Sequence, residues 1–331
     1  MPKLSPKVSV MMPVLNEGKH LRAAVESVLA QKYDGDIELI LALGPSRDGT
    51  NELAADLARA DERIRLIENP RGLTTVGLNL AIAASDAEVI ARIDAHSEPS
   101  ENYLATAVEV LQAKQAALVG GVMAAKGRSI IQRAVAWAYT SRFGIGGAAY
   151  HVGGQAGEAE SAYLGVFAAQ TLKNVGGYNE SIIRGEDWEL AQRIKKAGGL
   201  VWFDPRLQVT YWPRGRVNLL AKQFYSTGVW RGDLTRRDIA GASKRYFLPP
   251  ALVGVIFAGL VQLSLDNYLG ILPIAGYLLA IAALASTAVG LGLKERVALL
   301  FVLPTMHISW GLGFWIGFIF GARGTIDRSR V

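Results

Sequence analysis

A carboxylate and an imidazole follow the end of an apolar segment, in the stretch ARIDAHSEPSENYL at residues 91–104. Asp94 comes directly after the apolar run that ends at Ile93, and His96 lies two residues further on. A carboxylate supplies a hard oxygen ligand for a divalent cation, and a neutral imidazole supplies a nitrogen ligand. The alternative is a turn aspartate beside an exposed loop histidine, so the surrounding elements must decide between the two.

A second pair of carboxylates lies in RGEDWELAQRI at residues 184–194, where Glu186 and Asp187 precede an expected helix that ends at Gly198-Gly199. Acidic side chains in the first turn of a helix interact favourably with its dipole, which is a purely structural explanation. A position at the start of a helix can also point a carboxylate into a ligand site. Both explanations can hold at once.

Strands and helices are expected to alternate before residue 95. The apolar runs predict strands at 8–15, 37–43 and 63–69 and a fourth that ends at Asp94, with helices at 19–31, at 50–60 and at 74–84. Short connections between alternating elements make βαβ units and a parallel sheet, and ligands bind at the carboxyl ends of its strands. We therefore expect one crevice lined by Asn16-Glu17, the turn at 44–50, and Asp94 with His96.

The C-terminal third of the chain is far more apolar than the rest. The chain has 331 residues, of which 50% are hydrophobic and 19% charged. Residues 246–265 and 267–293 carry no charge, and residues 297–322 carry only His307. A transmembrane helix needs ~20 apolar residues, so each run is long enough to cross a bilayer. A buried core helix is the alternative for any one run, but three in succession favour a membrane domain.

Basic residues are concentrated immediately before these runs. Residues 206–245 contain nine Lys and Arg side chains against two Asp, which accounts for the net charge of +6. A basic block before an apolar span indicates a cytoplasmic surface that faces anionic lipid. Nucleic acid is the rival partner for basic charge, but no nucleic-acid-binding motif accompanies it. The chain has no cysteine, which rules out disulfides.

Topology follows from the same charges. The first apolar run, at residues 8–15, is too short for a signal peptide, so the first two-thirds of the chain should stay in the cytoplasm. Three spans then place the C-terminus outside, although the tail after residue 322 carries Arg323, Arg328 and Arg330. We expect three spans with the tail outside; the alternative is that one apolar run is re-entrant.

Several motifs together resemble the inverting family 2 glycosyltransferases with a GT-A fold. They are VSVMMPVLNEG, IELILALGPSRDGT, NPRGLTTVGLNLAIAASDAEVIARIDAH, VGGYNES and RGEDWELAQRIKKAGG. Three features resemble the succinoglycan-biosynthesis branch of that family: the motif RIDAH, the segment FGIGGAAYHVGG and the C-terminal apolar runs. The resemblance is strong over about 8–230. It implies an α/β fold: a GT-A nucleotide-sugar-binding domain with a Rossmann-like mixed sheet, followed by C-terminal transmembrane helices.

The resemblance implies a cation at the strand end. The family uses an Asp-x-Asp motif to hold a divalent cation against the donor diphosphate, and Asp94 and His96 occupy these positions. Imidazole suits Mn²⁺ better than Mg²⁺, so manganese is expected. The family's base-binding Asp after the second strand is absent, because the chain has Leu43-Gly44-Pro45-Ser46. Donor binding is therefore expected to rest on Asp94 together with Pro13, Glu17, Gly44, Arg71 and Asn79.

The resemblance also implies a catalytic base. Asp187 would take the proton from the acceptor hydroxyl, and Glu186 or Trp188 would position the acceptor. Relatives with a Gln-x-x-Arg-Trp motif bind the diphosphate there, and this chain is loosely similar, which makes Gln223, Trp230 and Arg231 candidates. The alternative for that helix is a place on the membrane interface, with its aromatic side chains at headgroup depth.

Together these features predict a membrane-anchored, metal-dependent, inverting glycosyltransferase of polysaccharide biosynthesis in the inner (cytoplasmic) membrane. The expected donor is a nucleotide sugar, and the expected acceptor is a lipid-linked saccharide or other polysaccharide precursor, or a polyprenyl phosphate. One alternative is a polyprenyl-phosphate sugar synthase, and another is a catalytically silent member that acts as a membrane partner. The expected division is a cytoplasmic GT-A domain at 1–230, with its basic interface segment at about 207–245, then a membrane domain at 246–322 and a short basic tail at 323–331.

Overall fold

The computed structural model describes residues 5–239 and 241–322 and divides the chain into two compact units. The first, here the α/β unit, comprises Met1–Ala124 and Ala148–Tyr211; the second, here the helical unit, comprises Ala125–Gly147 and Trp212–Val331. This division differs from a boundary at 230, because residues 125–147 and 212–230 pack with the apolar C-terminal helices. The predicted tail at 323–331 lies outside the described residues.

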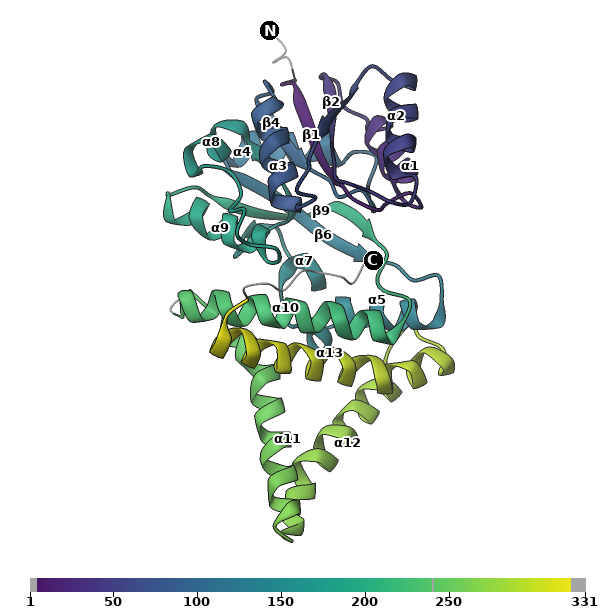
Figure 1. Cartoon of the computed structure of the whole chain (residues 1–331), viewed down its shortest axis with the longest axis vertical. Coiled ribbons are helices and arrows are strands. Elements are labelled where there is room, and N and C mark those ends of the chain that lie inside the picture. Colours follow the sequence, from purple (N-terminus) through teal and green to yellow (C-terminus); the bar gives the residue numbers. More distant parts are fainter. Residues whose placement is uncertain (1–4, 240, 323–331) are drawn as a thin grey trace. The chain divides into compact units, whose positions relative to one another are not determined.

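The α/β unit is built on one mixed sheet with helices on both faces (Figure 1). Its strands are β1 Val8–Val14, β2 Ile37–Leu43, β3 Ile64–Glu68, β4 Val89–Arg92, β5 Ser97–Pro99, β6 Leu118–Ala125, β7 Gly157–Glu158, β8 Tyr163–Ala168 and β9 Val201–Tyr211. Its helices are α1 Leu21–Leu29, α2 Thr50–Ala60, α3 Thr74–Ala84, α4 Tyr103–Lys114, α7 Ala149–Val152, α8 Ala169–Val175 and α9 Glu186–Lys196. The strand order is β3-β2-β1-β4-β8-β6-β9-β5, and β7 pairs with β9.

The first half of the sheet is parallel, as its alternating pattern predicts. β1 pairs in parallel with β2 and with β4, and β2 pairs in parallel with β3. Alternate residues of β1 face opposite layers: Val10 and Met12 join the core with α1, α2 and α4, whereas Met11 joins the core with α3, α8 and α9. The carboxyl ends of β1, β2 and β4 therefore lie at the same edge.

The second half of the sheet is antiparallel. β8 pairs antiparallel with both β4 and β6, while β5 and β7 pair antiparallel with β9. The segment 144–165 is rich in glycine, a composition typical of a flexible loop, yet it contains α7, β7 and the first residues of β8. Strand β8 forms there because its partners, β4 and β6, come from distant parts of the chain, which local composition does not reveal.

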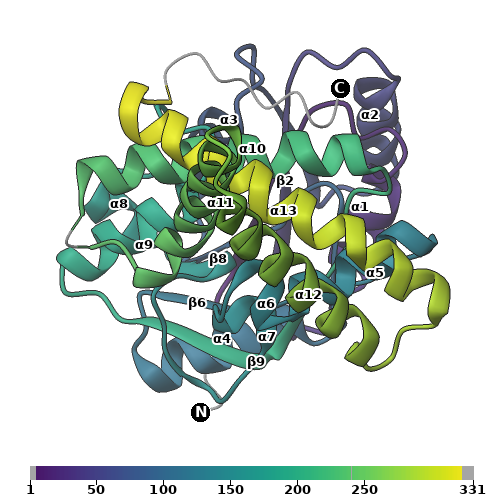
Figure 2. The ribbon, with the colours of Figure 1, turned by 90° about the horizontal axis from the view of Figure 1, so that it is seen from below.

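The last residue of β6, Ala125, belongs to the helical unit. Every other regular element among the described residues of this unit is a helix. The helices are α5 Ile130–Thr140, α6 Arg142–Ile145, α10 Val217–Arg237, the 3₁₀ helix η1 Lys244–Phe247, α11 Leu248–Ser264, η2 Tyr268–Gly270, α12 Ile271–Thr287 and α13 Leu293–Phe320. Three stretches are long and apolar enough to cross a membrane: Lys244–Ser264, Tyr268–Thr287 and Leu293–Phe320. α11 and α12 form a hairpin, and α13 lies beside α10 in both views (Figures 1 and 2).

Glycines set the close packing of α10 on α13. A Cβ at Gly228 would lie 2.1 Å from the carbonyl oxygen of Trp310, and one at Gly232 would lie 2.1 Å from that of Phe314. From the other side, a Cβ at Gly313 would lie 2.2 Å from the Tyr225 carbonyl oxygen. Only glycine allows backbones to approach this closely. This contact explains why α10 belongs to the helical unit.

Candidate active site

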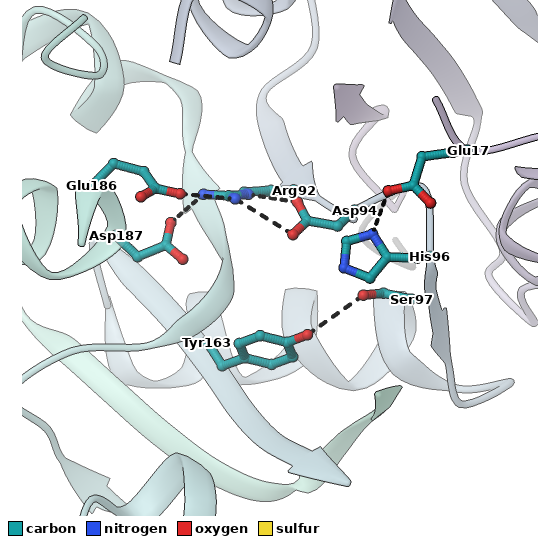
Figure 3. A network of polar contacts seen from close by, with 8 residues as sticks. All are labelled: Glu17, Arg92, Asp94, His96, Ser97, Tyr163, Glu186 and Asp187. Carbon is teal, nitrogen blue, oxygen red and sulfur yellow. Dashed lines mark hydrogen bonds and ion pairs between the residues drawn. The ribbon is translucent and has the colours of Figure 1, made fainter. Parts of the chain in front are cut away.

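A buried arginine at the end of β4 organises the polar edge of the sheet (Figure 3). The Arg92 side chain is 4% exposed, and its guanidinium binds three carboxylates. Its Nε donates to Asp94 at 3.0 Å and its Nη2 to Glu186 at 3.1 Å, while Nη1 donates to Asp187. A buried guanidinium is tolerated only when opposite charges pair with it. Through these pairs Arg92 joins the end of β4 to the start of α9.

The start of α9 is placed by a glycine. Gly185 precedes the helix with φ of 79°, a left-handed conformation that glycine adopts at little cost. Glu186 and Asp187 follow as the first helical residues, so their side chains lie at the positive end of the helix dipole. The two predicted chemical groups, Asp94 and the Glu186-Asp187 pair, are therefore brought together although they are about ninety residues apart in the chain.

The cluster is unbalanced in charge. Three ionised carboxylates around one guanidinium would leave a formal charge of −2. Burial raises the pKa of the Asp187 carboxyl to about 8; the Arg92 guanidinium opposes this rise, and the charges of Glu186 and Asp94 add to it. Asp187 therefore holds a proton more readily than an ordinary aspartate, and this site favours the arrival of positive charge.

His96 is held on the other side of Asp94 by the loop after β1. Its Nδ1 lies 3.1 Å from Glu17 Oε1, and its ring meets the edge of Tyr211 with centroids 6.3 Å apart. The Glu17 amide donates to Thr50 Oγ1 at 2.9 Å, which ties the first loop to the start of α2. Glu17 thus orients His96, as an outer carboxylate orients a histidine ligand in many metal sites.

The turn after β2 is fastened to the same loop. The Gly18 amide donates to Asp48 Oδ2 at 3.1 Å, and Asp48 also accepts from the Thr50 hydroxyl. Asp48 therefore fastens the turn after β2 to the loop after β1. Pro13 lies in β1, and the Gly44 amide donates to the Val14 carbonyl at 2.8 Å. The donor role predicted for Pro13, Glu17 and Gly44 stays a prediction.

Arg71 and Asn79 have structural partners. Arg71 Nη1 lies 2.6 Å from Glu180 Oε2. The Asn79 side chain accepts from the Tyr178 backbone N–H through Oδ1 at 2.8 Å, and its Nδ2 donates to the Tyr178 carbonyl at 2.9 Å. Both residues therefore fasten the turn that leads to α9, and their donor-binding role stays a prediction.

The remaining candidates lie in two places. Trp188 is buried within the α/β unit, and its Nε1 donates to Glu160 Oε1 at 2.8 Å. Gln223, Trp230 and Arg231 lie on α10 of the helical unit, where the Arg231 guanidinium stacks 4.3 Å from the Tyr246 ring centroid. Their roles toward acceptor or diphosphate stay predictions.

A divalent cation at this edge would need ligands from outside the protein. Within residues 5–239 and 241–322, no three His, Asp or Glu side chains gather in an arrangement that could hold a metal ion. Asp94 and His96 offer one carboxylate and one imidazole at the same strand end. That set fits an ion that takes its other ligands from substrate phosphates and water, as Mg²⁺ and Mn²⁺ commonly do.

Arg92 is not among the candidate residues predicted from the sequence. The available signal was a positive charge in the otherwise apolar run at 89–93, two residues before Asp94. Because side chains alternate along a strand, that spacing places both on one face. The partners Glu186 and Asp187 could not be paired with Arg92 from the sequence, because the pairing depends on how α9 packs against the sheet. Glu160 was also missed, and no local pattern marks it.

Comparison with known proteins agrees with this geometry. Residues 9–155 match the sequence model of the family Glycosyl transferase family 2. The chain is 30% identical over 313 residues to the succinoglycan biosynthesis protein ExoA of Rhizobium meliloti, covering 92% of this chain and 93% of that protein.

Two further similarities extend over nearly the whole chain. The dolichyl N-acetyl-alpha-D-glucosaminyl phosphate 3-beta-D-2,3-diacetamido-2,3-dideoxy-beta-D-glucuronosyltransferase of Methanococcus voltae is 23% identical over 95% of this chain and 98% of its own length. The mannosyltransferase PcManGT of Pyrobaculum calidifontis, solved with GDP-Man and Mn²⁺, superposes with a TM-score of 0.59 at 19% identity, over 95% of this chain and 87% of that one. The chain therefore belongs to glycosyl transferase family 2, and its mixed sheet has the GT-A fold.

Proposed function

We propose that this chain is an inverting glycosyltransferase that moves a sugar from a nucleotide-sugar donor to a lipid-linked saccharide at the cytoplasmic face of the membrane. The observation that carries the proposal is the cluster around Arg92, because it gathers Asp94, Glu186 and Asp187 at the carboxyl edge of the sheet. Three membrane-compatible helices support a lipid-linked acceptor, as does the dolichyl-phosphate compound in the name of the Methanococcus voltae relative.

The chemical step is a single displacement at the anomeric carbon. The acceptor oxygen forms a bond to that carbon while the bond to the diphosphate oxygen breaks, and the bonding electron pair leaves with the nucleoside diphosphate. The acceptor hydroxyl loses its proton to a base on the face opposite the leaving group. We assign that base to Asp187, because its raised pKa makes the ionised carboxylate a stronger base than an ordinary aspartate.

Asp94 and His96 would hold a divalent cation beside the donor diphosphate. When bound, the cation offsets the negative charge of the diphosphate and makes it a better leaving group. The unbalanced carboxylates around Arg92 favour such an ion electrostatically. An imidazole ligand favours Mn²⁺ over Mg²⁺, and the Mn²⁺ in the structure of the Pyrobaculum calidifontis relative agrees with this choice.

The test is transfer by the full-length enzyme in lipid vesicles, with polyprenyl-diphosphate sugars and polyprenyl phosphates offered as separate acceptors. Asp94→Ala should remove transfer and weaken Mn²⁺ binding in the presence of nucleoside diphosphate, whereas Asp86→Ala, an exposed carboxylate before the same strand, should change neither. His96→Asp should shift the metal preference toward Mg²⁺. Unchanged turnover in Asp94→Ala would remove the cation site, and a product formed only on polyprenyl phosphate would replace the proposed acceptor.

A further inference from the structure

The three apolar helices of the helical unit are packed very differently. In the most apolar windows of α11 and α12, 11% and 17% of the residues are buried in protein, whereas in α13 the share is 44%. A helix that crosses a bilayer as part of a simple hairpin needs few protein contacts, because lipid covers it. The burial of α13 therefore calls for an account of what lies against it.

Polar groups of the helical unit contact α13 from its beginning to its end. Near the start, Arg133 Nε of α5 donates to Glu295 at 2.9 Å. In the middle, His307 Nε2 lies 2.7 Å from the carbonyl oxygen of Phe143. Just beyond the end, a Cβ at Gly321 would lie 3.1 Å from the Arg236 guanidinium. A helix through the bilayer would place these first and last contacts at opposite membrane surfaces.

Helix α10 lies along the second half of α13, and the two helices run in the same direction. The register shows this: Tyr225 meets Gly313, Val229 meets Gly317, and Arg236 meets Gly321. Helix α10 carries five charged side chains: Lys222, Arg231, Asp233, Arg236 and Arg237. If α13 crossed the membrane, α10 would have to cross beside it, and charges within a bilayer are costly.

The opposite face of α13 is apolar and exposed in two stretches, before residue 302 and after residue 311. The side chains of that face are Leu293, Val297, Leu300, Phe301, Leu312, Trp315, Ile316, Ile319 and Phe320. Their spacing follows the period of one helix face. A helix with one face exposed and apolar and the other face covered by protein can lie in the plane of the membrane interface, with its apolar face on lipid.

We infer that α13 lies in the membrane interface with this face on lipid, and that only the α11–α12 hairpin crosses the bilayer. α13 runs across the wide end of the hairpin (Figures 1 and 2). The hairpin stretches of 21 and 20 residues have the length that a bilayer requires. The segment before α11 and the chain after α13 then share one side. This replaces the three-span expectation, and it removes the conflict with Arg323, Arg328 and Arg330, which now lie on the basic, cytoplasmic side.

The absence of native cysteine allows a direct test of sidedness. Single-cysteine variants of the full chain, Asp266→Cys at the hairpin tip, Gly290→Cys between α12 and α13, and Ser329→Cys in the tail, are treated in intact cells with a membrane-impermeant maleimide. We expect Asp266→Cys to be labelled from outside, and the other two only after the cells are permeabilised. Labelling of Ser329→Cys in intact cells, or none of Asp266→Cys, would overturn the topology.

A depth measurement tests the position of α13 itself. Nitroxides are attached in lipid vesicles at Val297→Cys, Phe301→Cys, Leu312→Cys and Phe320→Cys, all exposed positions whose replacement removes little packing. The matched control is Phe257→Cys on α11, an exposed aromatic of the hairpin. We expect the four α13 labels at one shallow depth and the control deeper.

Two outcomes would contradict the interfacial position. A profile that is deep at Leu312→Cys and shallow at both ends would show that α13 crosses the bilayer. Labels shielded from both oxygen and a water-soluble nickel chelate would show that a second protein copy covers the face instead of lipid. Neither measurement depends on transfer activity, so a failure of this inference is distinguishable from a failure of the proposed function.

Discussion

Each unit contains an ionic cluster with a buried centre, and these two clusters are built in opposite ways. In the α/β unit one guanidinium, Arg92 at the end of β4, serves three carboxylates, one from the residues after β4 and two from α9. In the helical unit one carboxylate, Asp233, which is fully buried, serves two guanidinium groups, Arg236 and Arg237. The first has an excess of negative charge and the second an excess of positive charge.

The difference lies in how far each cluster reaches along the chain. Asp233 pairs with residues three and four positions later on its own helix. The cluster therefore needs nothing beyond a helical α10. The Arg92 cluster exists only when the whole α/β unit is folded. The local cluster therefore stabilises its own helix, whereas the long-range cluster leaves an excess of negative charge at the candidate site.

Asp187→Asn tests this conclusion with the largest expected effect. The amide retains the shape of the side chain but cannot accept the acceptor proton, so turnover should fall by roughly 10²–10⁴. Donor binding should stay near its original strength. Glu189→Gln, which alters a carboxylate of the same helical turn that pairs with Arg193, is the matched control and should transfer normally. Equal losses of donor affinity and turnover would assign Asp187 to donor binding.

Arg92→Met removes the common partner of three carboxylates. We expect a loss of about 3–5 kcal/mol in the free energy of unfolding at pH 8, because buried carboxylates are left without a counter-charge. Their pKa values rise in the folded variant, so its stability is present at low pH and is lost as pH rises through those values. The thermal midpoints of variant and wild type should therefore diverge with increasing pH; a constant difference would mean that Arg92 contributes through packing alone.

Glu186→Gln tests how far the charge of Glu186 raises the pKa of Asp187. Ionised Asp187 is the active form, so kcat/KM of the wild type should rise with pH and level off above about 8. Removal of the neighbouring negative charge lowers the pKa of Asp187, and the rising limb should move to lower pH by ~1 unit. The pH dependence of the residual transfer measures this shift. An unmoved limb would show that another group controls the profile.

Asp233→Asn has the smallest expected effect. The substitution removes the ionic partner of two half-exposed guanidinium groups, and we expect a loss of about 1 kcal/mol, which lowers the thermal midpoint by ~2–4 °C. The pH profile of transfer should not change. A shift of that profile as large as the one expected for Glu186→Gln would contradict the separation between the two clusters.

The parallel half of the sheet could be predicted because its signals are local. The apolar runs and turn residues between Val8 and Arg92 mark each strand and helix within a short window, and family motifs lie at the strand ends. The antiparallel half could not, since β8 is defined by pairing with β4 and β6, whose residues are far away in the chain. Only the folded unit shows that pairing.

The candidate site divides in the same manner. Asp94, His96 and Asp187 were identified by their types and positions beside predicted elements, and the structure brings Asp94 and Asp187 to one guanidinium. Arg92 was missed because a basic residue inside an apolar strand has no meaning until its partners are known. The division of the structure also differs from the predicted boundary at 230, because the glycines of α10 acquire their role only when α13 lies against them.

The paired glycines also limit how α10 and α13 can move. Gly228 and Gly232 are four residues apart, and so are Gly313 and Gly317, which equals about one helical turn of 5.4 Å. A slide of half a turn would press side chains into backbone that now lies within contact distance. A slide of one full turn would refill only one of the two gaps with glycine and would press Phe224 or Arg236 into the other. The paired glycines therefore hold α10 and α13 in a single register.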